Sequence, residues 1–204
     1  MKIKHPDWLQ IAGEAGPLYG YNQEWYKTSY QQTRGCGPTT ASMLLSYLNR
    51  REAEALPYRD HDIPAITETM EQVWRFVTPG RLLGLHSTKA FCRGMNRLLR
   101  EHELTWNCRR LSVAAASFRR PSIEKVTAFL TDAFTADCPV AFLNLHKGKA
   151  TAMDSWHWTV LVGLELKRDE WRATCYDSGR AITFDLALWL ETTRLGGGFA
   201  YVKV

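Results

Sequence analysis

The segment 35–48 constrains this chain most, because it places a cysteine between two glycines directly before a helical pattern. Apolar residues recur at i, i+3, i+4 and i+7, which predicts an amphipathic helix: Ala41, Leu44, Leu45 and Leu48. Pro38 fits the first helical turn, where its missing N–H removes no hydrogen bond. Cys36 is therefore expected at the helix N-terminus, where free N–H groups and the macrodipole favour a thiolate over a thiol. A cysteine in this position is a candidate nucleophile, and it needs a base.

The candidate base is a histidine far along the chain. His157 opens the apolar and β-branched run 157–163, which predicts a buried strand. The run 171–177 predicts a second strand that ends at Asp177, and turn residues follow it. If these strands pair antiparallel, His157 lies beside Asp177. The expected arrangement has the carboxylate accepting the Nδ1–H of the histidine, which leaves Nε2 facing the thiol.

Three motifs together resemble the papain-like cysteine peptidase superfamily. They are Gly-Cys-Gly-Pro-Thr before a helix, Trp-His-Trp-Thr-Val-Leu-Val-Gly, and Tyr-Asp-Ser-Gly. Within that superfamily the sequence most resembles the bacteriocin-processing, or double-glycine, peptidase-like family. The resemblance covers roughly 31–204, with a weakly matching middle. It implies that Cys36 is the nucleophile, His157 the general base and Asp177 the residue that orients the histidine.

The resemblance also implies a glutamine a few residues before the nucleophile. The amide of that glutamine joins the cysteine N–H in an oxyanion hole, which stabilises the charge that develops on the attacked carbonyl. Gln31 and Gln32 lie five and four residues before Cys36, whereas the family pattern more often has six. Either glutamine could serve, so both stay candidates for the oxyanion hole.

The remaining patterns predict a single α+β domain over residues 1–204 with the papain-like fold. In this fold an N-terminal helical part packs on a C-terminal antiparallel β-sheet, and the active site lies between them. Helices are expected at 67–76, 88–101, 122–136 and 185–193, and strands at 104–111, 138–145, 157–165, 171–177, 181–184 and 199–204. Residues 1–30 have no regular period, and we expect an irregular segment or short strands that form one wall of the cleft. Tyr26 and Tyr30 are interpreted as packing residues in this segment.

The composition and the N-terminal sequence indicate in which cellular compartment the protein is expected. The chain is 45% hydrophobic and 23% charged, which is typical of a globular protein, and no run approaches the ~18 apolar residues of a membrane span. The N-terminus lacks the apolar core of a signal peptide. Five cysteines without close spacing fit reduced thiols better than a disulfide framework. We therefore expect a cytoplasmic protein without membrane contact, and secretion without a signal peptide stays open.

No cofactor, metal or nucleic acid is expected. The cysteines and histidines lack the C-x-x-C or H-x-x-x-H spacing of a zinc site, and the glycines at 196–198 precede a strand instead of opening a phosphate-binding helix. The net charge of +5 is modest. Arginine pairs at 109–110 and 119–120 could form a local basic patch, but the interleaved basic and aromatic pattern of a nucleic-acid module is not evident. Nothing in the sequence indicates the oligomeric state.

Each candidate residue also has a plain structural interpretation. The other cysteines are interpreted as small buried hydrophobes: Cys92, Cys108, Cys138 and Cys175. His157 could be a core histidine, and Asp177 could cap a turn. Asn144 could replace Asp177 as the orienting group, although its position within a strand makes this the weaker alternative.

The sequence thus predicts a thiol hydrolase that acts on an amide bond of a peptide or protein. A Cys–His–Asp triad would carry the reaction through a thioester intermediate. Three alternatives stay open on the same fold. Glutamine deamidation and acyl transfer to an amine use the same residues, and a catalytically silent peptide-binding module would keep the fold without the reaction.

Overall fold

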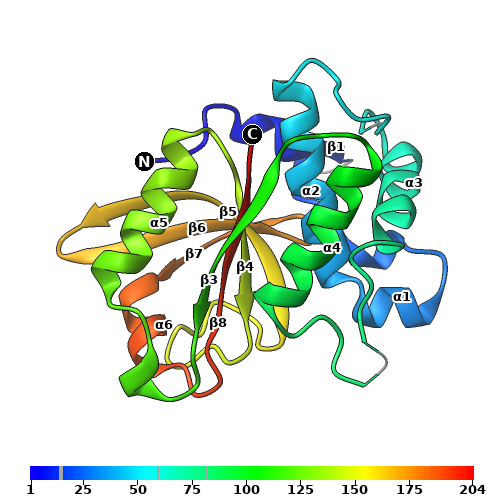
Figure 1. Cartoon of the computed structure of the whole chain (residues 1–204). Helices are drawn as coiled ribbons and strands as arrows, with labels where there is room; N and C mark the ends of the chain where they lie inside the picture. The colour runs from blue at the N-terminus through cyan, green and yellow to red at the C-terminus, as the bar shows by residue number, and fades with distance from the viewer. Residues whose placement is uncertain (14–15, 59, 81) are drawn as a thin grey trace.

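The computed structural model describes residues 1–13, 16–58, 60–80 and 82–204, and these residues form an α+β structure (Figure 1). Its centre is an antiparallel sheet of six strands in the order β3-β8-β4-β5-β6-β7. The strands are β3 (Asn107–Val113), β4 (Val140–Asn144), β5 (His157–Lys167), β6 (Glu170–Asp177), β7 (Arg180–Asp185) and β8 (Gly197–Lys203). Each lies within a few residues of its predicted range.

The α-helices are α1 (Ser29–Arg34), α2 (Cys36–Arg51), α3 (Ile63–Trp74), α4 (Thr88–Glu101), α5 (Ile123–Thr135) and α6 (Leu186–Thr192). The prediction for α4 is confirmed at both ends. Helix α3 begins four residues earlier than 67, because the Asp62 side chain accepts the Ala65 N–H and Pro64 fits the first turn. Ser122 caps α5 in the same way through the N–H of Lys125.

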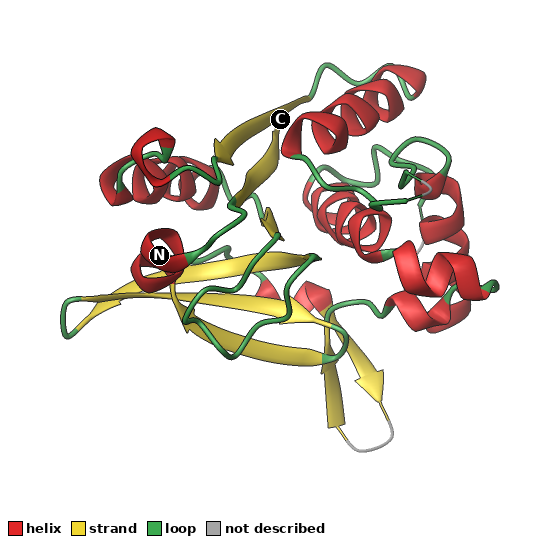
Figure 2. Cartoon of the chain, turned by 90° about the horizontal axis from the view of Figure 1, so that it is seen from below, coloured by secondary structure: helices red, strands yellow, loops and turns green. Residues whose placement is uncertain are grey.

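Helices cover both faces of the sheet, as Figures 1 and 2 show. Helices α2 and α4 contact β5 and β3 on one face, and α5 and α6 contact β5 and β6 on the other. The expectation of an N-terminal helical part on a C-terminal sheet is therefore too simple. The strands alternate apolar side chains on their two faces, so each face needs its own cover.

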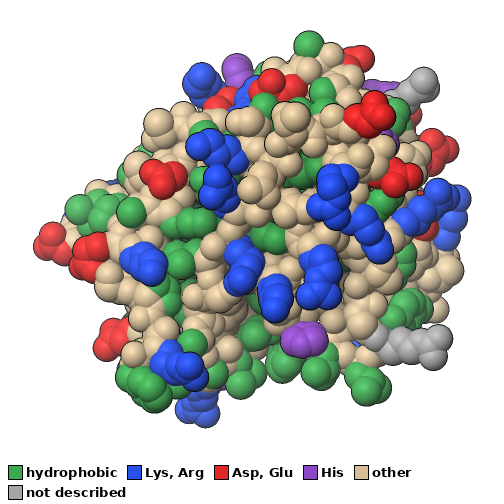
Figure 3. All heavy atoms as spheres, viewed as in Figure 1, with side chains coloured by type: hydrophobic (Ala, Val, Ile, Leu, Met, Phe, Trp, Pro, Cys, Tyr) green, Lys and Arg blue, Asp and Glu red, His purple; other side chains and the backbone are tan. Residues whose placement is uncertain are grey.

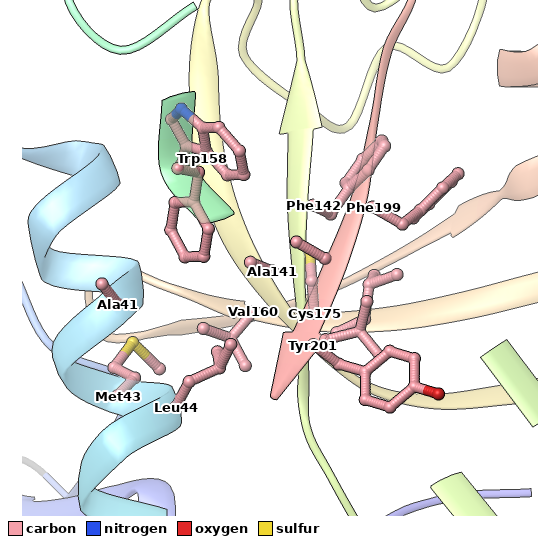
Figure 4. Packing of buried hydrophobic residues seen from close by; sticks show 14 of the residues in the cluster. Ala41, Met43, Leu44, Ala141, Phe142, Trp158, Val160, Cys175, Phe199 and Tyr201 are labelled. Carbon is pink, nitrogen blue, oxygen red and sulfur yellow. The ribbon is translucent and has the colours of Figure 1, made fainter. Parts of the chain in front are cut away.

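The interior shows this alternation directly (Figure 4). Ala141 and Val160 lie toward α2 on the first face. On the second face Phe142 stacks against Phe199 with ring centroids 5.1 Å apart, and Trp189 of α6 meets the Phe142 ring edge-on at 4.7 Å. Two closely packed apolar layers, one of them rich in aromatic rings, make the sheet a rigid base for the cleft residues.

Helix α2 is buried on all sides, although its sequence predicts one apolar face. Every residue from Gly37 to Asn49 is buried. The sheet, α3 and the short 3-10 helix η1 (Pro6–Leu9) all contact α2. Ser42 satisfies its buried hydroxyl on the Pro38 carbonyl within the helix. The helix that begins at Cys36 is thus held from every direction.

The N-terminal segment 1–30 contains short elements, as one of the two expectations for it allowed. Strands β1 (Gln10–Gly13) and β2 (Gly16–Tyr19) pair antiparallel, and the 3-10 helix η2 (Gln23–Trp25) follows. Tyr26 is buried and donates its hydroxyl to the Met70 carbonyl, in agreement with a packing role. Tyr30 is 46% exposed, so its burial does not support the same role. A third 3-10 helix, η3 (Ser117–Arg119), precedes α5.

Four of the cysteines are buried, as predicted: Cys92, Cys108, Cys138 and Cys175. Burial raises the pKa of the Cys108 and Cys138 thiols, and it raises the pKa of Cys175 to about 12. Among the described residues no helix has both the length and the apolar character needed to cross a membrane.

Candidate active site

Cys36 is the first residue of α2, separated from α1 only by Gly35. The two flanking glycines are required by close packing. A Cβ on Gly35 would lie 2.5 Å from the Gln31 carbonyl oxygen, and a Cβ on Gly37 would lie 2.7 Å from the Leu85 side chain. Larger residues would force these elements apart. The glycines therefore fix the corner at which the half-buried Cys36 thiol sits.

His157 and Asp177 come together across neighbouring strands. His157 is the first residue of β5 and Asp177 the last of β6, and the two strands pair antiparallel. The His157 Nε2 lies 2.8 Å from the Asp177 Oδ1. The predicted pairing is confirmed, but the ring nitrogens are exchanged: Nε2 meets the carboxylate, so Nδ1 is the nitrogen left for the thiol. Strand pairing can be predicted from sequence, whereas the ring orientation depends on the local backbone and packing.

The charge state of His157 follows from its two partners. Burial alone lowers the pKa of His157, because it penalises the imidazolium. Hydrogen bonds to Asp177 and to the Cys36 thiol, together with their negative charges, act in the other direction and raise this pKa to about 10. The histidine is therefore a cation at neutral pH. It lies between a carboxylate and a thiol, the arrangement that stabilises a thiolate.

Asp177 is itself held in place. Its side chain is 8% exposed, and the Ser178 hydroxyl donates to the same Oδ1 that meets His157, at 3.0 Å. The alternative orienting residue, Asn144, is occupied elsewhere. Its Nδ2 donates to the Asp154 carbonyl at 2.7 Å, and its Oδ1 accepts from Trp189 at 2.9 Å. Asn144 thereby ties the segment before His157 to α6.

The two glutamines expected at the oxyanion hole have other partners. The Gln31 amide donates to the Glu71 carboxylate at 2.6 Å. The Gln32 amide donates to two backbone carbonyls, that of Glu24 at 3.1 Å and that of Tyr26 at 2.8 Å. Both amides stabilise the contact of α1 with its neighbours. The oxyanion role of Gln31 and Gln32 stays a prediction that these hydrogen bonds do not favour.

A third glutamine lies beside the triad. Gln23 of η2 lines a small cavity together with Cys36 and His157. Its Nε2 donates to the Gln32 carbonyl at 2.6 Å, and within the described part of the chain its buried Oε1 has no hydrogen-bond partner. Sequence reasoning missed Gln23 because it lies thirteen residues before Cys36, with α1 between them. Its place next to the thiol depends on the fold of η2 against α1.

The cleft differs on the two sides of the triad. On one side a mainly apolar pocket of about 160 Å³ opens at Cys36, without His157. Thr33 and Arg34 are among its lining residues, and most of the others are leucines or a tryptophan: Leu82, Leu83, Leu85, Leu143, Leu145 and Trp156. On the other side a polar hollow of about 750 Å³ opens at His157, without Cys36, and its lining includes Gln23, Glu24, Asp154, Asp177 and Arg180. A ligand bound across the Cys36 thiol would thus place an apolar group in the pocket and a polar group in the hollow.

The loop before α4 is anchored next to the histidine. The Trp158 indole donates its N–H to the Leu85 carbonyl. The indole also stacks on Phe91 of α4, with ring centroids 4.6 Å apart. Because Trp158 follows His157 directly in β5, the apolar pocket and the triad share one rigid support.

Neither a protein-family model nor a curated protein matches the sequence. In the described residues no group of three or more His, Cys, Asp and Glu side chains is arranged to hold a metal ion.

Proposed function

We propose that this chain is a cysteine-dependent amide hydrolase with a papain-like fold, acting on a peptide or protein substrate without a cofactor. One observation carries the proposal. His157 lies 2.8 Å from the Asp177 carboxylate, and it lines one small cavity together with Cys36, which begins a helix that is buried from Gly37 to Asn49. The nucleophile Cys36, the base His157 and the orienting residue Asp177 thus follow one another in space, as in a catalytic triad.

The reaction would begin with the Cys36 thiolate attacking the amide carbon. Negative charge then develops on the carbonyl oxygen, and the donors assigned to it are the Cys36 N–H and the second N–H of the Gln23 side-chain amide, whose first N–H is donated to the Gln32 carbonyl. His157, protonated at neutral pH, gives a proton to the leaving amine. Water, activated by the then neutral histidine, attacks the thioester and releases the acid.

The two sides of the cleft suggest how the substrate lies. The leaving amine must approach His157, because this residue protonates it, and so it occupies the polar hollow. The acyl part then lies over Cys36 in the apolar pocket. The proposed substrate therefore has an apolar side chain on the acyl side of the scissile bond.

Fluorogenic peptide amides that differ only in this acyl-side residue test the proposal. Leucine or phenylalanine substrates should release the amine faster than glycine or glutamate substrates, and Cys36→Ala should abolish release. An absence of release above the Cys36→Ala background with every substrate, together with no covalent adduct of a peptidyl aldehyde at Cys36, would reject the proposed hydrolase.

A further inference from the structure

A groove lined by arginines lies next to the apolar pocket. It has a volume of about 500 Å³ between α4 and the segment 76–78, and Leu85 lines both the groove and the pocket that opens at Cys36. Three exposed arginines of α4 line the groove: Arg93, Arg97 and Arg100. A chain bound in the pocket would pass Leu85 and enter the groove.

Close packing shapes this groove. Gly94 faces the backbone of the neighbouring segment, where an added Cβ would lie 2.6 Å from the Phe76 carbonyl oxygen. Arg97 donates to the carbonyls of Arg75 at 2.7 Å and Phe76 at 3.1 Å, and its guanidinium lies 5.3 Å from the centre of the Phe76 ring. The arginine is thus held in a defined position at the groove wall.

The positive charge of the groove is not neutralised within the described residues. No ion pair there involves Arg93, Arg97 or Arg100; the acids at the end of α4, Glu101 and Glu103, lie beyond ion-pair distance. Blue side chains gather over α4 in Figure 3, and red ones lie mainly toward the edges of that view. Three arginines without acidic partners favour an anionic ligand with which they form charge-assisted hydrogen bonds.

We propose that this arginine groove binds acidic side chains of the substrate polypeptide, on the acyl side of the scissile bond and beyond the apolar residue. The inference rests on the proposed function, since the hydrolase orientation places the acyl side next to Leu85. Arg93 and Arg100 are seven residues apart on one helix, about 10 Å. This length corresponds to about three residues of extended chain.

Two features favour a polypeptide over a nucleic acid. The groove shares Leu85 with the pocket at the thiol, and apolar side chains form part of its lining: Phe76, Leu85 and Ala90. The lining has one aromatic ring, Phe76, and the Arg97 guanidinium already lies over one face of it, so the groove lacks the row of open rings on which successive bases stack.

Binding can be measured apart from catalysis in the full chain that carries Cys36→Ala. Fluorescence anisotropy would compare two labelled peptides, each with a leucine for the apolar pocket. One peptide has Glu-Asp-Glu at the positions four to six residues before the leucine, and the other has Gln-Asn-Gln at the same positions. We expect the acidic peptide to bind about tenfold more tightly, with an affinity that falls as salt rises.

The test variant is Arg93→Gln/Arg100→Gln, because neither arginine side chain is hydrogen-bonded to the described residues, and the replacement therefore breaks no contact that holds the fold. The matched control is Arg119→Gln/Lys125→Gln, which removes the same charge from exposed positions elsewhere. The preference for the acidic peptide should disappear in the first variant and persist in the second.

Three results would overturn the proposal. These are equal binding of the two peptides, equal loss in both variants, and tighter binding of a labelled single-stranded RNA dodecamer that is abolished by Arg93→Gln/Arg100→Gln. Because Cys36→Ala cannot hydrolyse an amide, none of these results depends on the reaction. Failure of the hydrolase itself would instead appear as unreactive Cys36 in the wild-type chain.

Discussion

Two cysteines close to the same pair of strands have opposite surroundings. Cys36 lies half-buried at a helix start, opens on a pocket and contacts a cationic histidine. Cys175 lies in the interior of β6, two residues before Asp177, and burial raises the pKa of its thiol to about 12. Residue type is the same in both regions. Access and a charged partner are what distinguish a candidate nucleophile from a packing residue.

The largest expected effect is the difference between these two cysteines. Cys36→Ala should abolish amide hydrolysis, because no other described cysteine opens on the cleft. Cys175→Ala should keep most of the activity and lower the free energy of unfolding by about 1–2 kcal/mol, since it leaves a small void in the sheet. Hydrolysis rates and urea unfolding of both variants would measure this. A Cys175→Ala protein that folds but is inactive would contradict the interpretation of Cys175 as a packing residue.

Removing the charged partner should bring Cys36 closer to Cys175 in reactivity. His157→Ala removes the base and the cation next to the thiol, and we expect kcat/KM to fall by about 10²–10⁴-fold. The same substitution at an unrelated exposed histidine, His61→Ala, is the control and should leave the rate unchanged. Equal rates in wild type and His157→Ala would show that the histidine does not act in the reaction.

A smaller effect on kcat should distinguish Gln23 from Gln31. Gln23→Ala removes the amide that lines the cavity with the thiol, and a lost oxyanion donor costs about 10²–10³-fold in kcat. Gln31→Ala breaks a hydrogen bond to Glu71 and should change stability more than kcat. Steady-state kinetics of the two variants tests the assignment. A larger loss of kcat in Gln31→Ala would return the oxyanion role to the glutamine near the family position.

The smallest effect concerns stability and pH. The His157 pKa is about 10 in the folded chain against 6.5 for an ordinary histidine, so the protonated histidine stabilises the fold fully below pH 6.5. This contribution is lost as pH rises through about 10. Urea unfolding from pH 6 to pH 10 should show a decline on the order of a few kcal/mol in wild type, and a weaker decline in Asp177→Asn. Identical slopes in the two proteins would contradict the ion-pair interpretation.

Local signals in the sequence were enough to predict much of this structure. Three correct predictions depend only on neighbouring residues or on one strand contact. They are the apolar period of α4, the cysteine at the start of α2 and the pairing of His157 with Asp177. The resemblance to a family added the roles of the three triad residues, which remain proposals.

The missed features depend on packing between distant segments. The burial of α2 from Gly37 to Asn49 needs η1, α3 and the sheet together, and the apolar pattern of the helix sequence does not predict it. Gln23 reaches the thiol only because η2 folds back on α1. The ring orientation of His157 is likewise set by contacts that its own strand does not encode.

The central claim is that His157 activates Cys36, and site-resolved alkylation tests it most directly. Wild type and His157→Ala would be treated with iodoacetamide from pH 5.5 to pH 9, and modification of each cysteine followed by mass spectrometry. The account predicts fast modification of Cys36 already near pH 6, strong slowing at that pH in His157→Ala, and no modification of Cys175 in the folded chain. Modification of Cys36 that rises with pH like a free thiol and is the same in both proteins would contradict it.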